Sequence, residues 1–251
     1  MSALDNEGYG VAQNNQHLYV QGLEALTSFS NEKEVTAQYI RDCGLGKSVL
    51  DIGAGNGKIA QLLDAGSNDH FVAVEQNPQL HARLTQMGIA AIEGTYPEVP
   101  IEGQFDTVFS SHSMPVRREA YELFIDAAYD RVLPGGHLTI VTFFDLPTPY
   151  ALTMERVGLP RDTSGTHTRA VGEYLESKGD THGHVLESGI RSRSLVDVIA
   201  AIAFIGSTNG NPQKLQLITE ELHSAPDILE GFRDEDEYVF PLHSQAFTVQ
   251  K

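Results

Sequence analysis

The sequence has 251 residues, of which 41% are hydrophobic and 20% charged, and 34 acidic residues outnumber 17 basic ones to give a formal net charge of −17. This composition is typical of a globular protein with a full core, and the negative charge disfavours nucleic acids and anionic membranes as partners. The sequence contains one cysteine, Cys43, and lacks both a signal-like N-terminus and an apolar run of about 20 residues, so we expect a cytoplasmic protein without disulfides.

The first part of the chain is predicted to be helical, because apolar residues recur at helical spacing across residues 9–44. The central part then alternates between strand and helix patterns. Short apolar runs predict five strands, at residues 47–52, 71–75, 90–92, 105–109 and 137–144. Helical patterns follow the first, second and fourth of these strands, at residues 58–63, 77–87 and 117–132.

The third of these helices is expected to turn Leu123 and Phe124 inward. The motif Leu133-Pro134-Gly135-Gly136 is expected to end this helix before the fifth strand. This alternation of strands and helices predicts a Rossmann-like, doubly wound α/β fold with a mostly parallel sheet.

The last part of the chain gives a mixed pattern. Residues 145–165 are rich in proline, threonine and glycine and predict a loop, and the acidic run at 234–237 predicts a solvated loop. Residues 238–249 predict an antiparallel terminal strand, or two strands joined by a bend. Helices are predicted at 168–178, 195–204 and 214–222, and a sixth strand at 184–188. The helices near both chain ends are expected to lie over the carboxyl edge of the sheet, where ligands bind in such folds.

A glycine-rich turn, Asp51-Ile52-Gly53-Ala54-Gly55-Asn56-Gly57, follows the first predicted strand. A dinucleotide-binding turn has glycines at its first, third and sixth positions, and the sixth position here is Lys58. S-adenosylmethionine (SAM) carries no phosphate and needs only a close approach of the backbone, which Gly53, Gly55 and Gly57 permit because they lack a Cβ and tolerate positive φ. The turn therefore predicts SAM as the cofactor.

Residues at the ends of the predicted strands complete the expected cofactor site. Glu75 is positioned to accept both ribose hydroxyls, and Asp51 to face either the turn amides or the methionine amine. The segment around Gly94 is expected to border the adenine, and the one around His112 to lie under the cofactor, near the reactive methyl group. The predicted cofactor-binding residues are Asp51, Gly53, Gly55, Gly57, Glu75, Gln76, Gly94, Thr95, Ser111 and His112.

The segments 49–57, 74–75 and 133–136 make residues 47–144 resemble the class I SAM-dependent methyltransferases. A longer similarity to histamine N-methyltransferase and its relatives runs from Tyr19-Val20 through Leu26 and Ser30-Asn31-Glu32 to Leu217-Ile218-Thr219-Glu220-Glu221-Leu222 and Val239-Phe240. The resemblance implies a single methyltransferase domain over residues 1–251. We expect its SAM-binding core at 47–144, a helical cap and acceptor region at 1–46 and 145–235, and the terminal strand at 236–251.

The same resemblance suggests which residues contact the acceptor. A glutamate of the N-terminal helical region recognises the amine in that family, and the matching residue is Glu32. The family has a glutamine after the fourth strand and an asparagine in the last strand, where this sequence has His112 and Leu242-His243. Because two of three contacts differ, we expect a small amine or imidazole-like acceptor in place of histamine. The expected acceptor-binding residues are Tyr19, Glu32, His112, Leu242 and His243.

Methyl transfer from a sulfonium is an in-line displacement that depends on holding the acceptor close to the methyl group. We expect Glu32 to fix the acceptor, and His112 or His243 to orient or deprotonate it. His182-Gly183-His184 lacks further ligands at metal spacing, so it predicts an exposed turn, and no metal is expected. Two alternatives remain open, namely O-methylation of a small natural product and a SAM-binding protein without transfer activity.

Overall fold

The computed structural model of the protein describes residues 16–67, 70–115, 117–143, 148–158, 164–207 and 211–251. These residues divide into two units. The helical unit takes the described parts of Met1–Glu32, Pro147–Asp162 and Ser188–Leu242. The sheet unit takes those of Lys33–Leu146, Thr163–Glu187 and His243–Lys251.

The strands form one sheet of eight strands among the described residues, in the order β3-β2-β1-β4-β5-β8-β6, and β7 pairs with β8. The pairs among β1 to β5 are parallel, and β8 runs antiparallel to β5. The sheet therefore has the predicted Rossmann-like, mostly parallel form with an antiparallel terminal strand. The strands are β1 (Val49–Ile52), β2 (Phe71–Glu75), β3 (Ala90–Glu93), β4 (Phe105–Ser111), β5 (Val132–Phe143), β6 (Thr181–Ser192), β7 (Arg233–Asp234) and β8 (Glu237–Gln250).

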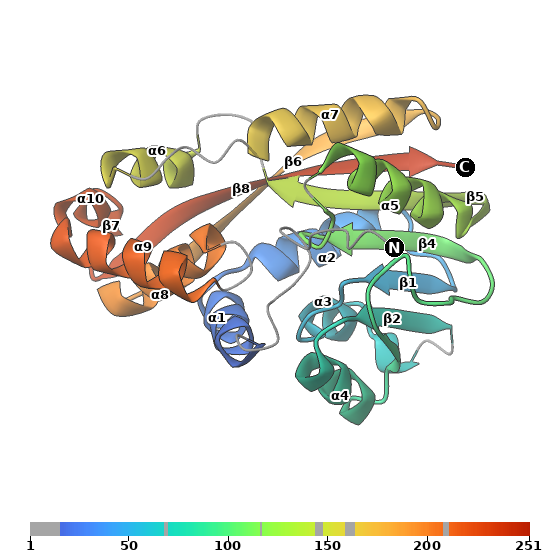
Figure 1. Cartoon of the computed structure of the whole chain (residues 1–251), viewed down its shortest axis with the longest axis horizontal. Coiled ribbons are helices and arrows are strands. Elements are labelled where there is room, and N and C mark those ends of the chain that lie inside the picture. The colour runs from blue at the N-terminus through green and yellow to red at the C-terminus, as the bar shows by residue number, and fades with distance from the viewer. Residues whose placement is uncertain (1–15, 68–69, 116, 144–147, 159–163, 208–210) are drawn as a thin grey trace, which may run out of the picture. The chain divides into compact units, whose positions relative to one another are not determined.

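The helices of the sheet unit connect its strands, as Figure 1 shows for α3, α4 and α5. This unit contains α2 (Glu32–Asp42, from Lys33 on), α3 (Lys58–Leu62), the 3-10 turn η2 (Ala65–Ser67), α4 (Pro78–Gln86), α5 (Arg118–Asp130) and α7 (Ser164–Glu176). The helical unit contains α1 (Gln16–Phe29), α6 (Pro149–Arg156), α8 (Leu195–Gly206), α9 (Pro212–Ser224) and α10 (Asp227–Glu230). No helix in the described part of the chain has the length and apolar content to cross a membrane.

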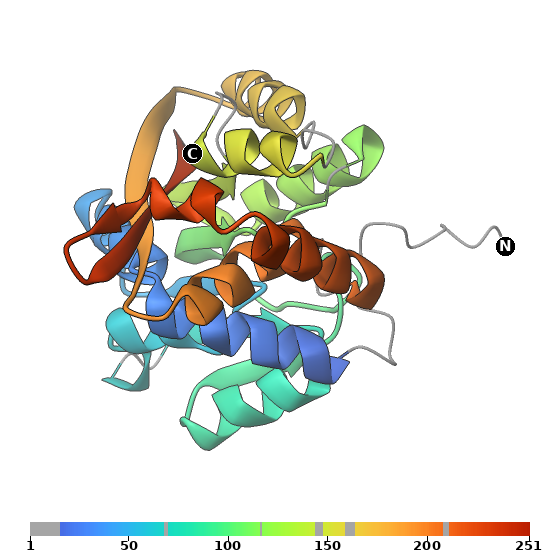
Figure 2. The same ribbon diagram turned by 90° about the vertical axis from the view of Figure 1, so that its left-hand side faces the viewer.

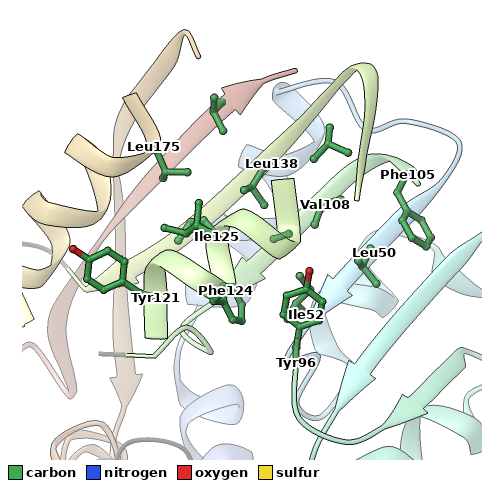
Figure 3. Close-up of a cluster of buried hydrophobic side chains, with 14 of the residues drawn as sticks. Leu50, Ile52, Tyr96, Phe105, Val108, Tyr121, Phe124, Ile125, Leu138 and Leu175 are labelled. Atoms are coloured by element: carbon green, nitrogen blue, oxygen red, sulfur yellow. The ribbon is translucent and has the colours of Figure 1, made fainter. Parts of the chain in front are cut away.

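Both faces of the sheet are covered, because successive side chains of β1 enter different cores. Leu50 and Ile52 pack in a cluster with Phe124 and Ile125 of α5, and Figure 3 shows these side chains together. Val49 instead packs in a cluster with residues of α2, α3 and α4. The side chain of Asp51, two residues after Val49, therefore lies on the face covered by α2, α3 and α4.

The helical unit is built around α8, which is apolar over most of its length and buried. Helix α1 packs against it, as the blue and orange helices in Figure 2 show. Gly22 permits this close contact, because a Cβ at this position would overlap the ring of Phe204. Helix α9 packs on α8 as well, and Ile218 and Leu222 join the same core.

Two predictions near the chain ends were wrong in part. The predicted loop at 145–165 contains helix α6, which Thr148 caps by accepting a hydrogen bond from the Ala151 N–H at 3.1 Å. The segment His182-Gly183-His184 is exposed as predicted, but it belongs to strand β6 and not to a turn. By contrast, the acidic run at 234–237 agrees with the predicted solvated loop before a strand, because it forms the tip of the β7–β8 hairpin. Strand β8 is continuous, which is the first of the two forms predicted for the end of the chain.

The fifth strand begins earlier than predicted. Helix α5 ends at Asp130 and strand β5 begins at Val132, so the motif at 133–136 lies within the strand, where the pairing with β4 shifts its register between Val132 and His137. The end of the chain pairs with this part of β5. The Gly135 N–H donates to the Lys251 carbonyl at 2.8 Å, and the Lys251 N–H donates to the Gly136 carbonyl at 3.0 Å. In the preceding helix α5, Leu123 was predicted to face inward, but its side chain is 60% exposed.

The segment at 9–44 is helical as predicted in its described part, where it forms two helices, α1 and α2; residues 9–15 lie outside the described residues. Ser30 pairs with Ile190 in an isolated β-bridge between α1 and α2. Asn31 then exchanges hydrogen bonds with the Gly189 backbone, through its N–H at 3.2 Å and its side-chain oxygen at 2.8 Å. These bonds to a distant strand interrupt the helix.

Candidate active site

Three polar side chains lie on one face of the sheet where strands β2, β1 and β4 end. Asp51 is in register with Ala73 of β2 and Phe109 of β4. Because side chains alternate along a strand, Glu75 and Ser111, each two residues further on, lie on the same face as Asp51. The structure therefore brings these three predicted cofactor-binding residues together at the carboxyl edge of the sheet.

The glycine turn has the backbone that its sequence predicts. The φ angles of Gly53, Gly55 and Gly57 are 77°, 58° and 77°, all in the left-handed region that favours glycine. The N–H groups of Gly53 and Ala54 donate to the Val74 carbonyl at 2.9 and 3.0 Å. The turn is thus attached to the end of β2, beside Glu75.

The structure gives Gly53 a second role besides its backbone angle. A Cβ at Gly53 would overlap the side chain of Ser113. The Ser113 hydroxyl donates to the Ile52 carbonyl at 2.6 Å and shares a hydrogen bond with the Ser110 hydroxyl at 2.7 Å. Gly53 therefore leaves room for a serine pair that links the ends of β1 and β4, which the sequence analysis missed.

Glu75 holds the glycine turn and the start of α4 with one carboxylate. Its Oε2 atom accepts a hydrogen bond from the Gly55 N–H at 2.7 Å, and its Oε1 atom from the Asn77 N–H at 2.7 Å. Burial raises the pKa of Glu75, and these N–H donors oppose that shift. Each carboxylate oxygen can accept more than one hydrogen bond, so Glu75 retains capacity for a hydroxyl ligand.

Asp51 is a buried acid, with only 2% of its surface exposed. Its Oδ2 atom has no hydrogen-bond partner among the described residues. Burial raises the pKa of Asp51 to about 8, an effect that the charge of Lys33 opposes and that of Glu75 reinforces. A buried carboxylate oxygen without a donor is suited to a cationic ligand, the second of the two roles predicted for Asp51.

The predicted adenine-side residues lie next to Glu75. The Gly94 N–H donates to the Glu75 carbonyl at 3.1 Å. The Thr95 hydroxyl donates to the Gln76 side chain at 3.5 Å. Gly94 has a φ of 142°, and a Cβ there would overlap Val99. These contacts place the loops after β2 and β3 side by side.

His112, directly after β4, has an unusual backbone. Its φ angle is 55°, a left-handed conformation that non-glycine residues seldom adopt. Its N–H donates to the Val141 carbonyl at 2.9 Å, which extends the β4–β5 pairing by one residue. The Nε2 atom of His112 lies 3.2 Å from the hydroxyl oxygen of Ser244 in β8, at hydrogen-bond distance.

Ser244 is a site residue that the sequence analysis missed. Buried and more exposed residues alternate along β8, so Ser244 and Leu242 lie on one side of the strand and His243 on the other. Ser244 is 4% exposed and contacts His112 directly. Side chains of a strand alternate between its two sides, and applying this period of two residues to the predicted last strand would have placed Ser244 and His243 on different sides.

The remaining predicted acceptor residues belong to the helical unit. Glu32 is the first residue of α2, is 7% exposed, and its N–H donates to the Ser30 hydroxyl at 3.0 Å. The Tyr19 ring packs against Phe204 at 5.5 Å between centroids. Among the described residues, no three His, Cys, Asp or Glu side chains are arranged to hold a metal ion.

A family model described as a methyltransferase domain matches residues 49–136, the segment that contains the glycine turn and Glu75. This match identifies a methyltransferase domain within the chain. No curated protein sequence matches the chain.

Solved structures share the fold of this chain. A possible histamine N-methyltransferase from Thermotoga maritima has a TM-score of 0.54 and 13% identity, over 94% of this chain and 99% of that one. The plantazolicin methyltransferase BpumL in complex with SAH has a TM-score of 0.53 and 13% identity, over 96% and 91%. The YcgJ protein from Bacillus subtilis has a TM-score of 0.54 and 11% identity, over 87% and 98%. At these identities the similarity shows the fold alone.

Replacing Gly53 by alanine is expected to destabilise the methyltransferase domain through both backbone strain and steric overlap. Gly88 is a matched control, because its φ is 78° and no atom lies within 4 Å of an added Cβ. Gly88→Ala should cost about 1–2 kcal/mol of unfolding free energy from the left-handed backbone alone. Gly53→Ala should cost about 1–3 kcal/mol more, because Ser113 must move. Urea unfolding of both variants measures the difference, and equal losses would contradict the packing role of Gly53.

Proposed function

We propose that this protein transfers a methyl group from SAM to a nitrogen of a small amine, imidazole-like or amino-acid-derived acceptor. The observation that carries the proposal is His112, a side chain with a titratable nitrogen, held at the carboxyl edge of the sheet by a left-handed backbone and by Ser244. The net charge of −17 supports a neutral or cationic acceptor over a nucleic acid.

The geometry of the carboxyl edge supports the proposed cofactor roles. SAM supplies the electrophilic methyl group on its sulfonium. The backbone of the glycine turn lets the cofactor approach, and Glu75 accepts the ribose hydroxyls with the lone pairs that its two backbone donors leave open. The orphaned oxygen of Asp51 accepts the cofactor ammonium. Gly94 and Thr95, in the loop beside Gln76, border the adenine.

His112 is the residue that acts on the acceptor in this proposal. An amine attacks through its lone pair, so the enzyme must orient that lone pair toward the methyl group. If the amine is protonated, a base must first remove the proton that occupies the lone pair. The imidazole of His112 accepts that proton or holds the N–H group in line. Ser244 acts as a positioning residue, since its hydroxyl contacts Nε2 and fixes the ring. Glu32 recognises the positive charge or N–H group of the acceptor.

Replacing His112 by alanine is expected to lower kcat by about 100-fold or more, the usual contribution of a positioned acid or base. The dissociation constant of S-adenosylhomocysteine (SAH) should stay within about twofold, because the Asp51 and Glu75 carboxylates remain in place. Ser244→Ala should cause a smaller loss of kcat, since the ring is retained but less well oriented. Steady-state kinetics and calorimetry measure the two effects.

Two other histidines serve as comparisons for this experiment. His182→Ala is the control, because the His182 side chain is 77% exposed and lies in β6. His243→Ala decides between the two candidate histidines, since His243 lies on the opposite side of β8 from Ser244. A large loss in His243→Ala with none in His112→Ala would transfer the catalytic role to His243.

The acceptor class is tested by incubating the protein with SAM and separate pools of amines, imidazoles, amino acids and phenols. Mass spectrometry then detects any product heavier by one methylene. A product from an amine or imidazole pool supports N-methylation, and one from phenols alone supports the O-methylation alternative. Tight SAH binding without turnover on any pool would favour a SAM-binding protein without transfer activity.

A further inference from the structure

Lys33 projects from the buried face of α2 toward the carboxyl edge of the sheet. Ala37 and Ile40, four and seven residues further on, are 1% and 0% exposed and pack against the sheet. Positions at these spacings share one side of a helix, so Lys33 lies on the same side of α2 as Ala37 and Ile40, near the N-terminal end of the helix. Its Nζ atom donates to the Ser111 hydroxyl at 3.4 Å.

The same ammonium acts on Asp51. The charge of Lys33 lowers the pKa of Asp51 and opposes the effect of burial. Asp51 and Ser111 lie on one face of adjacent strands. Lys33 of α2 thus contacts a residue that shares the sheet face of Asp51, at the start of the glycine turn, and Asp51 has an oxygen without a donor.

We infer that Lys33 and Asp51 together recognise the zwitterionic amino-acid end of the cofactor, with Lys33 binding its carboxylate and Asp51 its ammonium. The inference rests on the proposed placement of SAM at this edge. A cation and an anion on the protein can bind the carboxylate and the ammonium of a zwitterion, respectively. Hydrogen bonds between ionised groups are stronger than those between neutral groups. Lys33 is then a specificity-determining residue that the sequence analysis did not identify.

The positive charge of Lys33 also excludes a wrong cofactor. Decarboxylated SAM keeps its sulfonium and ammonium but has no negative charge to offer the lysine. Its ammonium would approach Lys33 in a partly buried site, where repulsion between like charges is weakly screened. The pair therefore selects cofactors that retain the carboxylate.

The test compares three ligands by calorimetry on the full chain: SAH, decarboxylated SAH and methylthioadenosine, which lacks the whole amino-acid end. Lys33→Met should weaken SAH binding by about 10-fold to 100-fold, the value of one hydrogen bond to a charged group. It should leave methylthioadenosine unchanged and should not weaken decarboxylated SAH. Lys47→Met removes the same charge from an exposed residue before β1 and should change none of the three affinities.

Two further variants distinguish recognition from folding. Lys33→Arg keeps the charge and should restore most of the SAH affinity, and Lys33→Gln removes the charge with a polar chain if the methionine variant fails to fold. Equal losses for SAH and methylthioadenosine would overturn the inference and leave Lys33 as a structural residue. If the wild-type protein bound none of the three ligands, the proposed cofactor site itself would fail.

Discussion

Glu75→Ala is expected to weaken SAH binding by about 100-fold or more, because it removes a charged acceptor for two ribose hydroxyls and loosens the glycine turn. In the structure its carboxylate accepts the N–H groups of Gly55 and Asn77, both at 2.7 Å. The alanine variant leaves those two donors without their acceptor, at a cost of about 1–3 kcal/mol each in unfolding free energy. Affinity and stability should therefore fall together, as calorimetry and urea unfolding can measure.

Glu93 provides a matched control for this prediction. It pairs in register with Glu75 and ends the neighbouring strand, but its side chain is 53% exposed and its only described ionic partner is His81, at 3.5 Å. Glu93→Ala removes the same group one strand away and should change SAH affinity by less than about twofold, since an exposed pair contributes little. Similar losses in both variants would show that general charge, and not the Glu75 contacts, controls binding.

The core of the fold was predictable because its signals are local. Val49 to Glu75 contains two buried strands and a glycine turn whose backbone angles favour glycine, and each of these features is visible in a short window. The failures involve contacts distant in sequence. The start of β5 depends on Lys251, and the division between α1 and α2 depends on Gly189. No local pattern in the sequence contains either partner.

The site was predictable to the same extent. Asp51, Glu75 and Ser111 follow from strand ends, and the structure brings them to one edge. Lys33 was missed because its proposed role depends on which face of α2 packs against the sheet. Its spacing of four residues from Ala37 indicates that the two residues share a face of the helix. Ser244 was missed because the asparagine of the resembling family matches Leu242-His243 in this sequence. His243 is one residue away from Ser244 and lies on the other side of the strand.

SAH binding is expected to strengthen as pH rises toward 8, because the buried acid Asp51 must be ionised to accept the ligand ammonium. Burial raises the pKa of Asp51 to about 8, so the carboxyl is protonated in the free protein at lower pH. Binding the ammonium then expels that proton, and the affinity should increase by up to about tenfold for each pH unit between about pH 6 and about pH 8. Above the pKa of Asp51 the increase should stop.

Two charged neighbours change the pKa of Asp51, and the pH measurement therefore needs a control that isolates the proton of Asp51. Lys33 of α2 lowers its pKa and Glu75 of β2 raises it. Burial also raises the pKa of Glu75, so a second proton could contribute to the slope. Asp51→Asn keeps the shape and removes one titrating group, and it should bind SAH weakly with a flattened pH dependence. Calorimetry in two buffers of different ionisation enthalpy counts the protons released, and an unchanged slope in Asp51→Asn would assign the proton to Glu75.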